Sequence, residues 1–272
     1  MNIDRKKVRE QFASYTRNYN AEDPKIALKI AHTYHVADNC EEIAKSIGLR
    51  CEDADFAWLS GMLHDIGRFE QVKRYNTFID SESVDHAEFG ADLLFGKEHL
   101  APDYYGERAY DEMLETVIRQ HNKYRIDAVV TGRTLTFCNI LRDADKVDIL
   151  RVNVETPMEE IYNVSEEELL SSGVSDKVMA QVREHHAVNR DVMVSPAEHL
   201  IGHIALSFEL VYPKSRELAK KQGYLDKMFD FPSRNESTLK ALRDTRDELE
   251  MFYGSGEDSV KQAMKIADPP KG

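Results

Sequence analysis

The sequence predicts an all-α protein, and two observations carry this prediction. Apolar residues recur every three or four positions over most of the 272-residue chain, which is the spacing of one face of a helix. Strand patterns are weak, because the segment 127–130 is short and isolated. We therefore expect a bundle of helices.

Amphipathic helices are expected in order along the chain. A helix over residues 26–47 has a stripe made of Ile26, Ile30, Val36, Cys40, Ile43 and Ile47. Gly48 is expected to end it. Residues 54–63 predict a short helix that is buried on most sides, which Gly67 is expected to break. Ser83 or Asp85 is a candidate cap for a helix over residues 84–95. Further helices are predicted over residues 1–19, 110–121, 134–150, 197–211 and 236–252.

The simplest organisation is a single domain over residues 1–272. The stretches 96–109, 123–133, 151–164 and 230–236 resemble linkers, but none is rich enough in Pro, Gly or Ser to require a domain boundary. We expect a motif-bearing core over about residues 26–150, with the helices of about 160–253 packed on it. The tail, residues 254–272, is expected to fray.

The composition excludes several classes of protein. A net charge of −13 argues against bulk nucleic acid and anionic membranes as partners. Three widely spaced cysteines indicate neither a disulfide framework nor a zinc ribbon. The N-terminus lacks the apolar region of a signal peptide, and no run approaches 18 apolar residues, so a cytoplasmic protein is expected.

Ionisable side chains occur among residues that otherwise form the core. His64 and Asp65 lie in GMLHDIG, and Asp145 lies in RDADKVDIL. Three more histidines lie on or beside apolar helix faces, namely His32, His86 and His121. Burying such groups is costly unless they are paired, hydrogen-bonded or bound to a metal.

Together these six residues outline a metal site. Imidazole and carboxylate suit iron, manganese, cobalt, nickel or zinc, and the lack of thiolates argues against a structural zinc. Six ligands exceed one four-coordinate site. They fit two ions about 3.5–4 Å apart that share a carboxylate.

These motifs resemble the HD superfamily of metal-dependent phosphohydrolases, whose signature is H…HD…D on a bundle of helices. His32 begins HTYHV, the doublet lies in LHDIGR, and Asp145 lies in DADK. Members with two metals add two histidines between the doublet and the last Asp, and His86 and His121 match them. The resemblance covers about residues 26–150.

The resemblance implies a ligand set. One metal would be held by His32, His64, Asp65 and Asp145, and a second by His86, His121 and a bridging Asp65. The implied cofactors are two divalent ions, with iron or manganese favoured and cobalt, nickel, zinc or magnesium left open. The chain departs from the family pattern in two places: His35 stands where Arg is usual, and Asn122 stands where several members carry a second His.

The implied function is hydrolysis of a phosphate ester of a nucleotide or another small metabolite by a metal-bound hydroxide. Asp65, Arg68 and Lys123 are the predicted catalytic residues. Basic residues beside the motifs are predicted to bind the substrate, namely Arg68, Lys73, Arg74, Lys123 and Lys146. Two alternatives remain open, a di-iron oxygenase of HD type and a catalytically silent nucleotide-binding module. The oligomeric state is not predicted, and a homodimer is left open.

Other histidines carry less information. His199 and His203 are four residues apart on an apolar helix, and a place in the core is favoured over a zinc site. His185 and His186 lie in a polar stretch and are expected at the surface.

Overall fold

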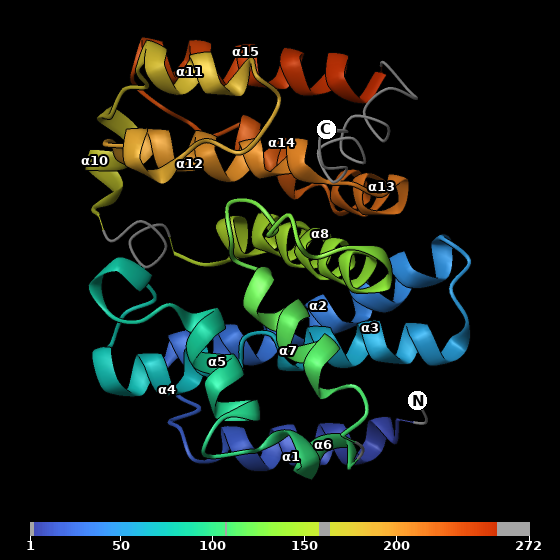
Figure 1. Cartoon of the computed structure of the whole chain (residues 1–272). Coiled ribbons are helices and arrows are strands. Elements are labelled where there is room, and N and C mark those ends of the chain that lie inside the picture. The colour runs from blue at the N-terminus through green and yellow to red at the C-terminus, as the bar shows by residue number, and fades with distance from the viewer. Residues whose placement is uncertain (1–2, 107, 158–163, 255–272) are drawn as a thin grey trace. The chain divides into compact units, whose positions relative to one another are not determined.

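The structure is a computed structural model that describes residues 3–106, 108–157 and 164–254 (Figure 1). Within these ranges it contains helices and turns but no strand, so the all-α prediction is confirmed. Its α-helices are α1 Arg5–Thr16, α2 Pro24–Ser46, α3 Cys51–Leu63, α4 Ile66–Tyr75, α5 His86–Phe95, α6 Ala101–Tyr105, α7 Asp111–Gln120, α8 Gly132–Glu155, α10 Glu166–Ser171, α11 Asp176–Val182, α12 Pro196–Ala205, α13 Pro213–Gln222, α14 Tyr224–Phe229 and α15 Glu236–Gly254. Short 3₁₀ segments are η1 Asp80–Glu82, η2 Arg190–Val192 and η3 Leu206–Glu209. None of the helices described has the length and apolar character needed to cross a membrane.

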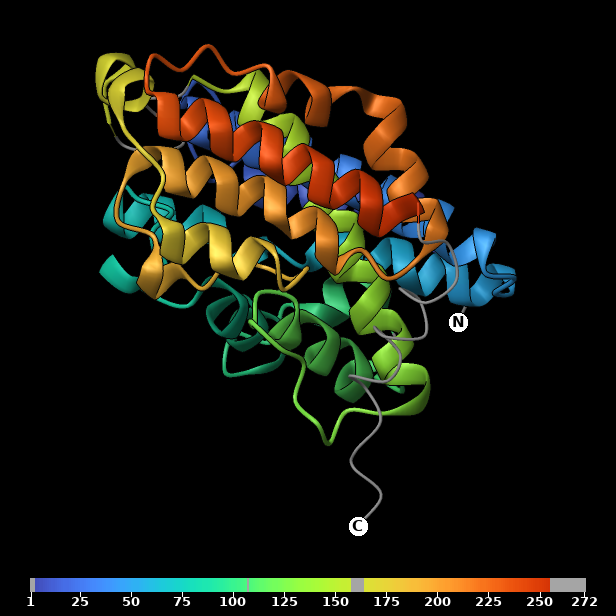
Figure 2. The ribbon, with the colours of Figure 1, turned by 90° about the horizontal axis from the view of Figure 1, so that it is seen from above.

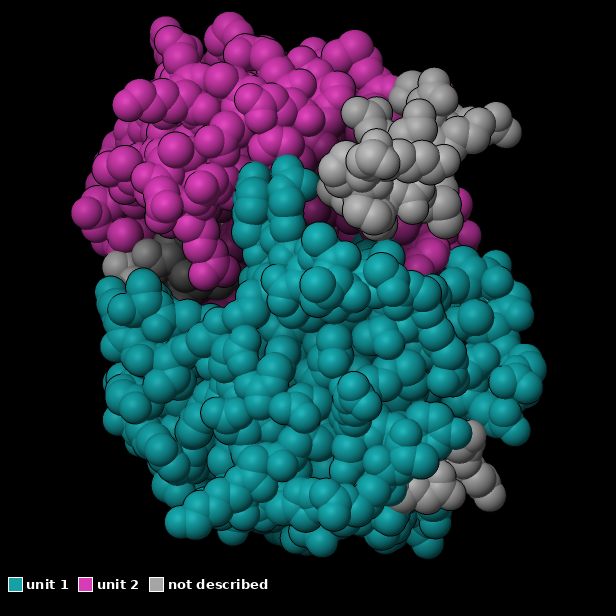
Figure 3. Space-filling model, viewed as in Figure 1, with its two compact units in different colours: residues 1–145 teal, residues 146–272 magenta. Residues whose placement is uncertain are grey.

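The chain divides into two compact units, residues 1–145 and 146–272, with the boundary inside α8 (Figure 3). The single domain over residues 1–272 stays a prediction. Every residue of the predicted metal site lies in the first unit, so this unit is the one that positions the site.

In the first unit, α2 and α3 pack closely against each other. Asp23 caps the start of α2, because its carboxylate accepts a hydrogen bond from the Lys25 backbone N–H, and Pro24 is the first residue of the helix. The middle of its apolar stripe is fully buried, at Val36, Cys40 and Ile43. The two helices approach closely because α3 presents Gly61: a Cβ atom there would lie 2.5 Å from the Cα of Ala37 on α2.

A second close contact joins α4 to α5. A Cβ atom on Gly67 would lie 2.6 Å from the backbone oxygen of His86 and 2.7 Å from the backbone nitrogen of Gly90. α5 also packs on α7, and α1 packs on α6. These contacts form the core of the first unit together with buried aromatic residues such as Trp58 and Phe69.

The second unit is built around α12. This helix begins with a capping box, in which Ser195 and Glu198 exchange hydrogen bonds, and it contacts α10, α11, α14 and α15. α12 and α15 lie side by side in both ribbon views (Figures 1 and 2). The short helices α10, α11, α13 and α14 did not stand out as individual helices in the sequence.

Several predicted boundaries are wrong. Gly67 does not break a helix, because the chain turns at His64 and Asp65 and α4 then begins at Ile66. The predicted linker 96–109 contains α6, whose Ala101 and Tyr104 are buried. α8 extends to Glu155, into the predicted linker 151–164.

One further boundary correction concerns a helix, and the segment with the weak strand pattern is a turn. The helix predicted over 197–211 ends as an α-helix at Ala205 and continues as the 3₁₀ segment η3. The strand candidate 127–130 is a turn closed by a hydrogen bond from the Val130 N–H to the Asp127 carbonyl. The predicted tail lies outside the described residues from residue 255 onward.

Candidate metal centre

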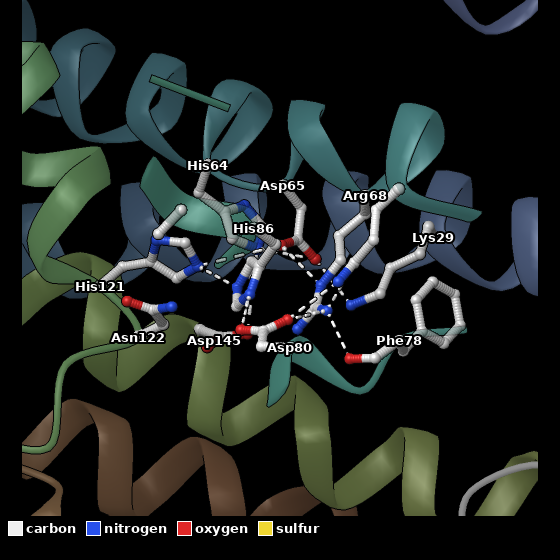
Figure 4. Close-up of polar contacts among 12 residues, drawn as sticks. Lys29, His64, Asp65, Arg68, Phe78, Asp80, His86, His121, Asn122 and Asp145 are labelled. Atoms are coloured by element: carbon white, nitrogen blue, oxygen red, sulfur yellow. Dashed lines mark hydrogen bonds and ion pairs between the residues drawn. The ribbon is translucent and has the colours of Figure 1, made fainter. Parts of the chain in front are cut away.

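Six side chains from separate parts of the first unit converge on one buried cluster. They occupy one position within α2 (His32), two consecutive positions between α3 and α4 (His64, Asp65), the first position of α5 (His86), the position after α7 (His121) and one position within α8 (Asp145). Figure 4 labels His64, Asp65, His86, His121 and Asp145 of this cluster. The four histidines and Asp65 are at most 5% exposed, and the Asp145 side chain is 17% exposed.

The first half of the cluster consists of His32, His64, Asp145 and the Oδ2 atom of Asp65. The Nε2 atom of His32 lies 3.1 Å from Oδ1 of Asp145, 3.6 Å from Oδ2 of Asp65 and 3.3 Å from Nε2 of His64. His64 Nε2 lies 3.5 Å from the same Asp65 oxygen. His32, His64 and Asp65 each offer one ligand atom within 4.8 Å of the others, so this group could hold a metal ion.

The second half consists of His86, His121 and the other carboxylate oxygen, Oδ1 of Asp65. That oxygen lies 3.6 Å from Nε2 of His86 and 3.9 Å from Nε2 of His121. The two imidazole nitrogens are 3.1 Å apart. The carboxylate of Asp65 therefore presents one oxygen to each half.

Hydrogen bonds on the far side of three rings fix their tautomers. Nδ1 of His64 donates to the Gly61 carbonyl at 2.7 Å, and Nδ1 of His121 donates to the Ile118 carbonyl at 2.6 Å. Nδ1 of His86 donates to Oδ2 of Asp80 at 2.6 Å. A neutral imidazole carries one N–H, so Nε2 of each ring directs a lone pair into the cluster.

This arrangement fits a bound cation. In the second half, two lone pairs of His86 and His121 face each other, which is repulsive unless a cation lies between them. Burial lowers the pKa of His64 to about 4 and of His86 to about 3, and it lowers the pKa of His121. Protons therefore do not supply that charge near neutral pH, whereas a divalent metal would.

Asp65 leads to the same conclusion. Its Oδ1 atom is buried and has no hydrogen-bond partner among the described residues, a costly state for a carboxylate oxygen. Burial alone would raise its pKa, but the positive charges of Lys29 and Arg68 hold the pKa well below its usual range. Asp65 is thus ionised, with one oxygen available to a cation.

The predicted basic residues lie in different surroundings. Arg68 is close to the cluster, with Nε 3.6 Å from Oδ1 of Asp65 and Nη1 2.8 Å from Oδ1 of Asp80. Lys123 pairs with Asp85 and Glu88 at 3.2 and 2.8 Å. Lys146 follows Asp145 on α8 and is buried.

The observed contacts of Lys73 and Arg74 are not with the cluster. Both pair with Glu70 and are more than half exposed. They follow Arg68 on α4 by five and six residues, so they lie on another face of that helix.

The two departures from the family motif also have clear surroundings. His35 is exposed on α2, away from the buried stripe. The amide nitrogen of Asn122 donates to Oδ1 of Asp85 at 2.8 Å. Among the described residues, His35 belongs to no group of side chains that could hold a metal ion.

Two site residues did not emerge from the sequence, Lys29 and Asp80. Nζ of Lys29 lies 2.6 Å from Oδ2 of Asp65. A signal for Lys29 was available, because it precedes His32 by three residues and therefore shares its helix face. Asp80 lies in the connection between α4 and α5, where no periodicity marks it.

Outside the first unit, no histidine among the described residues belongs to a group that could hold a metal ion. His185 pairs with Glu248 at 2.8 Å and stacks on Phe208. Its side chain is 34% exposed. Burial lowers the pKa of His203 to about 3.

Residues 30–150 match the model of one protein family, described as HD domain. The matched range contains all six cluster residues. No curated protein and no solved structure is significantly similar to the chain.

Proposed function

We propose that the protein is a phosphohydrolase that acts with two divalent ions. The proposal starts from the finding that residues 30–150 of this chain are an HD domain. HD domains belong to a superfamily of metal-dependent hydrolases, and this is the coarser statement from which the proposal starts. The substrate would be a phosphate ester of a nucleotide or of another small metabolite. Iron and manganese are the favoured ions because the ligands are imidazoles and carboxylates.

One observation carries the proposal: the two oxygens of Asp65 face two separate pairs of histidines. His32 and His64 would hold the first ion with Oδ2 of Asp65 and with Asp145. His86 and His121 would hold the second ion with Oδ1 of Asp65. A bound pair of divalent ions acidifies water and offsets the charge of a phosphoryl group.

The chain's own residues would bind and orient the phosphate. Lys29 and Arg68 both lie beside Asp65, with side chains 16% and 12% exposed. The ring of Phe78 lies near both, 5.4 Å from Nζ of Lys29 and 5.6 Å from Cζ of Arg68. Two cations next to the bridging carboxylate supply the positive potential that phosphoryl transfer requires.

Lys123 is less suited to this role, because its ion pairs are with Asp85 and Glu88 and not with the carboxylate of Asp65. We therefore assign phosphate binding to Lys29 and Arg68. Truncating Arg68 to alanine tests the assignment, and Arg74→Ala on the same helix is the matched control. The proposal requires that only the first variant raise KM or lower kcat for the best substrate.

The central experiment combines metal analysis with a substrate screen. Protein purified without added metal is analysed for its metal content, and phosphate release is then measured with nucleotides and common phosphate esters. We expect two ions per chain and release of phosphate. No release with any ester under several metals would contradict the proposal, and oxygen uptake with a diol or phosphonate would point to the oxygenase alternative.

A further inference from the structure

Asp80 connects three groups around the second half of the cluster. It lies in the connection between α4 and α5, at the start of η1. Its Oδ1 atom accepts hydrogen bonds from Nη1 of Arg68 at 2.8 Å and from Nε2 of Gln71 at 3.0 Å. Its Oδ2 atom accepts one from Nδ1 of His86 at 2.6 Å. Each oxygen thus has its own donors.

The bond to His86 decides which ring nitrogen can bind a metal. With the proton on Nδ1, Nε2 is left with a lone pair, 3.1 Å from Nε2 of His121. We propose that Asp80 is the positioning residue that sets the tautomer and orientation of His86, and so governs binding of the second ion while leaving the first intact. This inference rests on the proposed two-ion function.

An amide cannot replace this carboxylate. If the amide nitrogen of an asparagine faced His86, it would favour the wrong tautomer, with the proton on Nε2. If it faced the other way, it would meet the donors of Arg68 and Gln71. The first orientation puts a proton on the nitrogen that would bind the metal, and the second opposes donors to donors, so Asp80→Asn changes the site without changing the size of the side chain.

The first half gives an internal reference, because His64 is oriented by the main-chain carbonyl of Gly61 and needs no such side chain. Removing the outer hydrogen-bond partner of a metal-binding histidine typically lowers metal affinity by about 10–100-fold. We therefore expect Asp80→Asn to weaken the second ion by about that factor, with no matching change in the first.

The test is a titration of the metal-free full-length protein with Co²⁺, followed by visible absorption. Wild type and Glu70→Gln, which alters a carboxylate on α4 away from the cluster, should bind two ions. The Asp80→Asn protein should bind the tighter, first ion as the wild type does and should bind the weaker, second ion with lower affinity. If Asp80→Asn binds both ions with wild-type affinities, the role of Asp80 is overturned but the two-ion function is not. Binding of one ion by the wild type would overturn the two-ion function and this role together.

A second measurement needs no substitution at Asp80, and it decides the matter if that variant does not fold. The ¹⁵N shifts of the His86 imidazole in the metal-free wild type, assigned by their absence in His86→Ala, report its tautomer. A proton on Nδ1 at neutral pH supports the inference. A proton on Nε2 overturns it.

Discussion

The first half of the cluster is built mainly on helix faces, whereas the second half is built at helix ends. His32 lies within α2 and Asp145 within α8, and α2 packs closely on α3 through Gly61. His86 is the first residue of α5, and His121 follows the last residue of α7. A ligand inside a helix is fixed by the packing of the whole helix, while a ligand at an end depends on local hydrogen bonds.

The hydrogen bonds of the second half fit this difference. Asp80 holds the ring of His86, and the guanidinium of Arg142 donates to the carbonyl of His121 at 3.3 Å. Arg142 also donates to the carbonyls of Gln120 and Lys123, so it fixes the end of α7. The second ion should therefore be the weaker of the two and the easier to perturb.

The largest effect is expected where the halves meet. Asp65→Asn removes the shared carboxylate, so both ions should be lost, and activity should fall by about 10³-fold or more because each ion contributes several kcal/mol. His121→Ala should retain about one ion per chain. Metal analysis by mass spectrometry distinguishes the two results.

Matched controls are available for both changes. Asp92→Asn alters a carboxylate that is 66% exposed, and His35→Ala alters an exposed histidine on α2. Both should retain the full metal content. Loss of both ions in His121→Ala would mean that the halves are not separable.

A smaller effect is expected from Lys29, which contacts the first half only. Lys29→Met removes an ammonium group 2.6 Å from Oδ2 of Asp65 but keeps much of the side-chain volume. If this group binds the substrate phosphate, KM should rise by about 10–100-fold, the value of a charged hydrogen bond. Lys45→Met, at a position on α2 that is 61% exposed, should leave steady-state kinetics unchanged. An unchanged KM in Lys29→Met would remove Lys29 from the substrate site.

Two glycines allow each half to be disturbed by itself. Gly61→Ala would place a Cβ 2.5 Å from the Cα of Ala37, and Gly67→Ala would place one 2.6 Å from the backbone oxygen of His86. Overpacking costs about 1–3 kcal/mol, of which alanine regains up to about 1 kcal/mol as a better helix former. We expect each protein to lose about 1–2 kcal/mol of unfolding free energy in urea titrations.

The metal response should differ between these two variants. Gly61→Ala separates α2 from α3 and should weaken the first ion, whereas Gly67→Ala shifts the start of α5 and should weaken the second. Gly254→Ala, at the end of α15 with open space around it, is the control for the substitution itself. Equal weakening of both ions by Gly67→Ala would contradict the separation of the halves.

The contrast between helix faces and helix ends also explains which site residues could be predicted from the sequence. His32 and the α2 stripe follow from helical periodicity, which is local. The doublet and the last Asp stand in recognisable motifs, and the structure brings them together with His86 and His121. Asp80 acts through contacts with three partners that only the folded chain assembles, and no pattern precedes it.

The wrong boundary at Gly67 has a related cause. Glycine usually weakens a helix, so the sequence favours a break there. In the structure the missing side chain instead permits the close approach of α4 to α5. The short helices of the second unit escaped individual prediction because each offers only one or two turns of periodicity.

The smallest effect concerns the scaffold of the first half under acid. Arg5 of α1 joins α2 to α3, because its guanidinium lies 2.6 Å from both Glu41 and Asp55. The hydrogen bond from Arg5, together with that from Lys45, lowers the pKa of Glu41 from 4.5 to about 2. The folded state thus binds this proton less readily than the unfolded state does. Its contribution is complete above about pH 4.5 and is lost as the pH falls towards about 2.

Glu41→Gln should therefore cost about 0.5 kcal/mol of unfolding free energy at neutral pH, since the pair is partly exposed and screened by solvent. The difference from wild type should stay constant from about pH 6 to about pH 4.5 and then shrink as the pH of urea titrations is lowered to about 3. Glu10→Gln, whose carboxylate lies 3.8 Å from Lys6 at the surface, is the matched control. A difference that stayed constant over this range would show that Glu41 acts by packing, and the bracing of the first half would then not depend on charge.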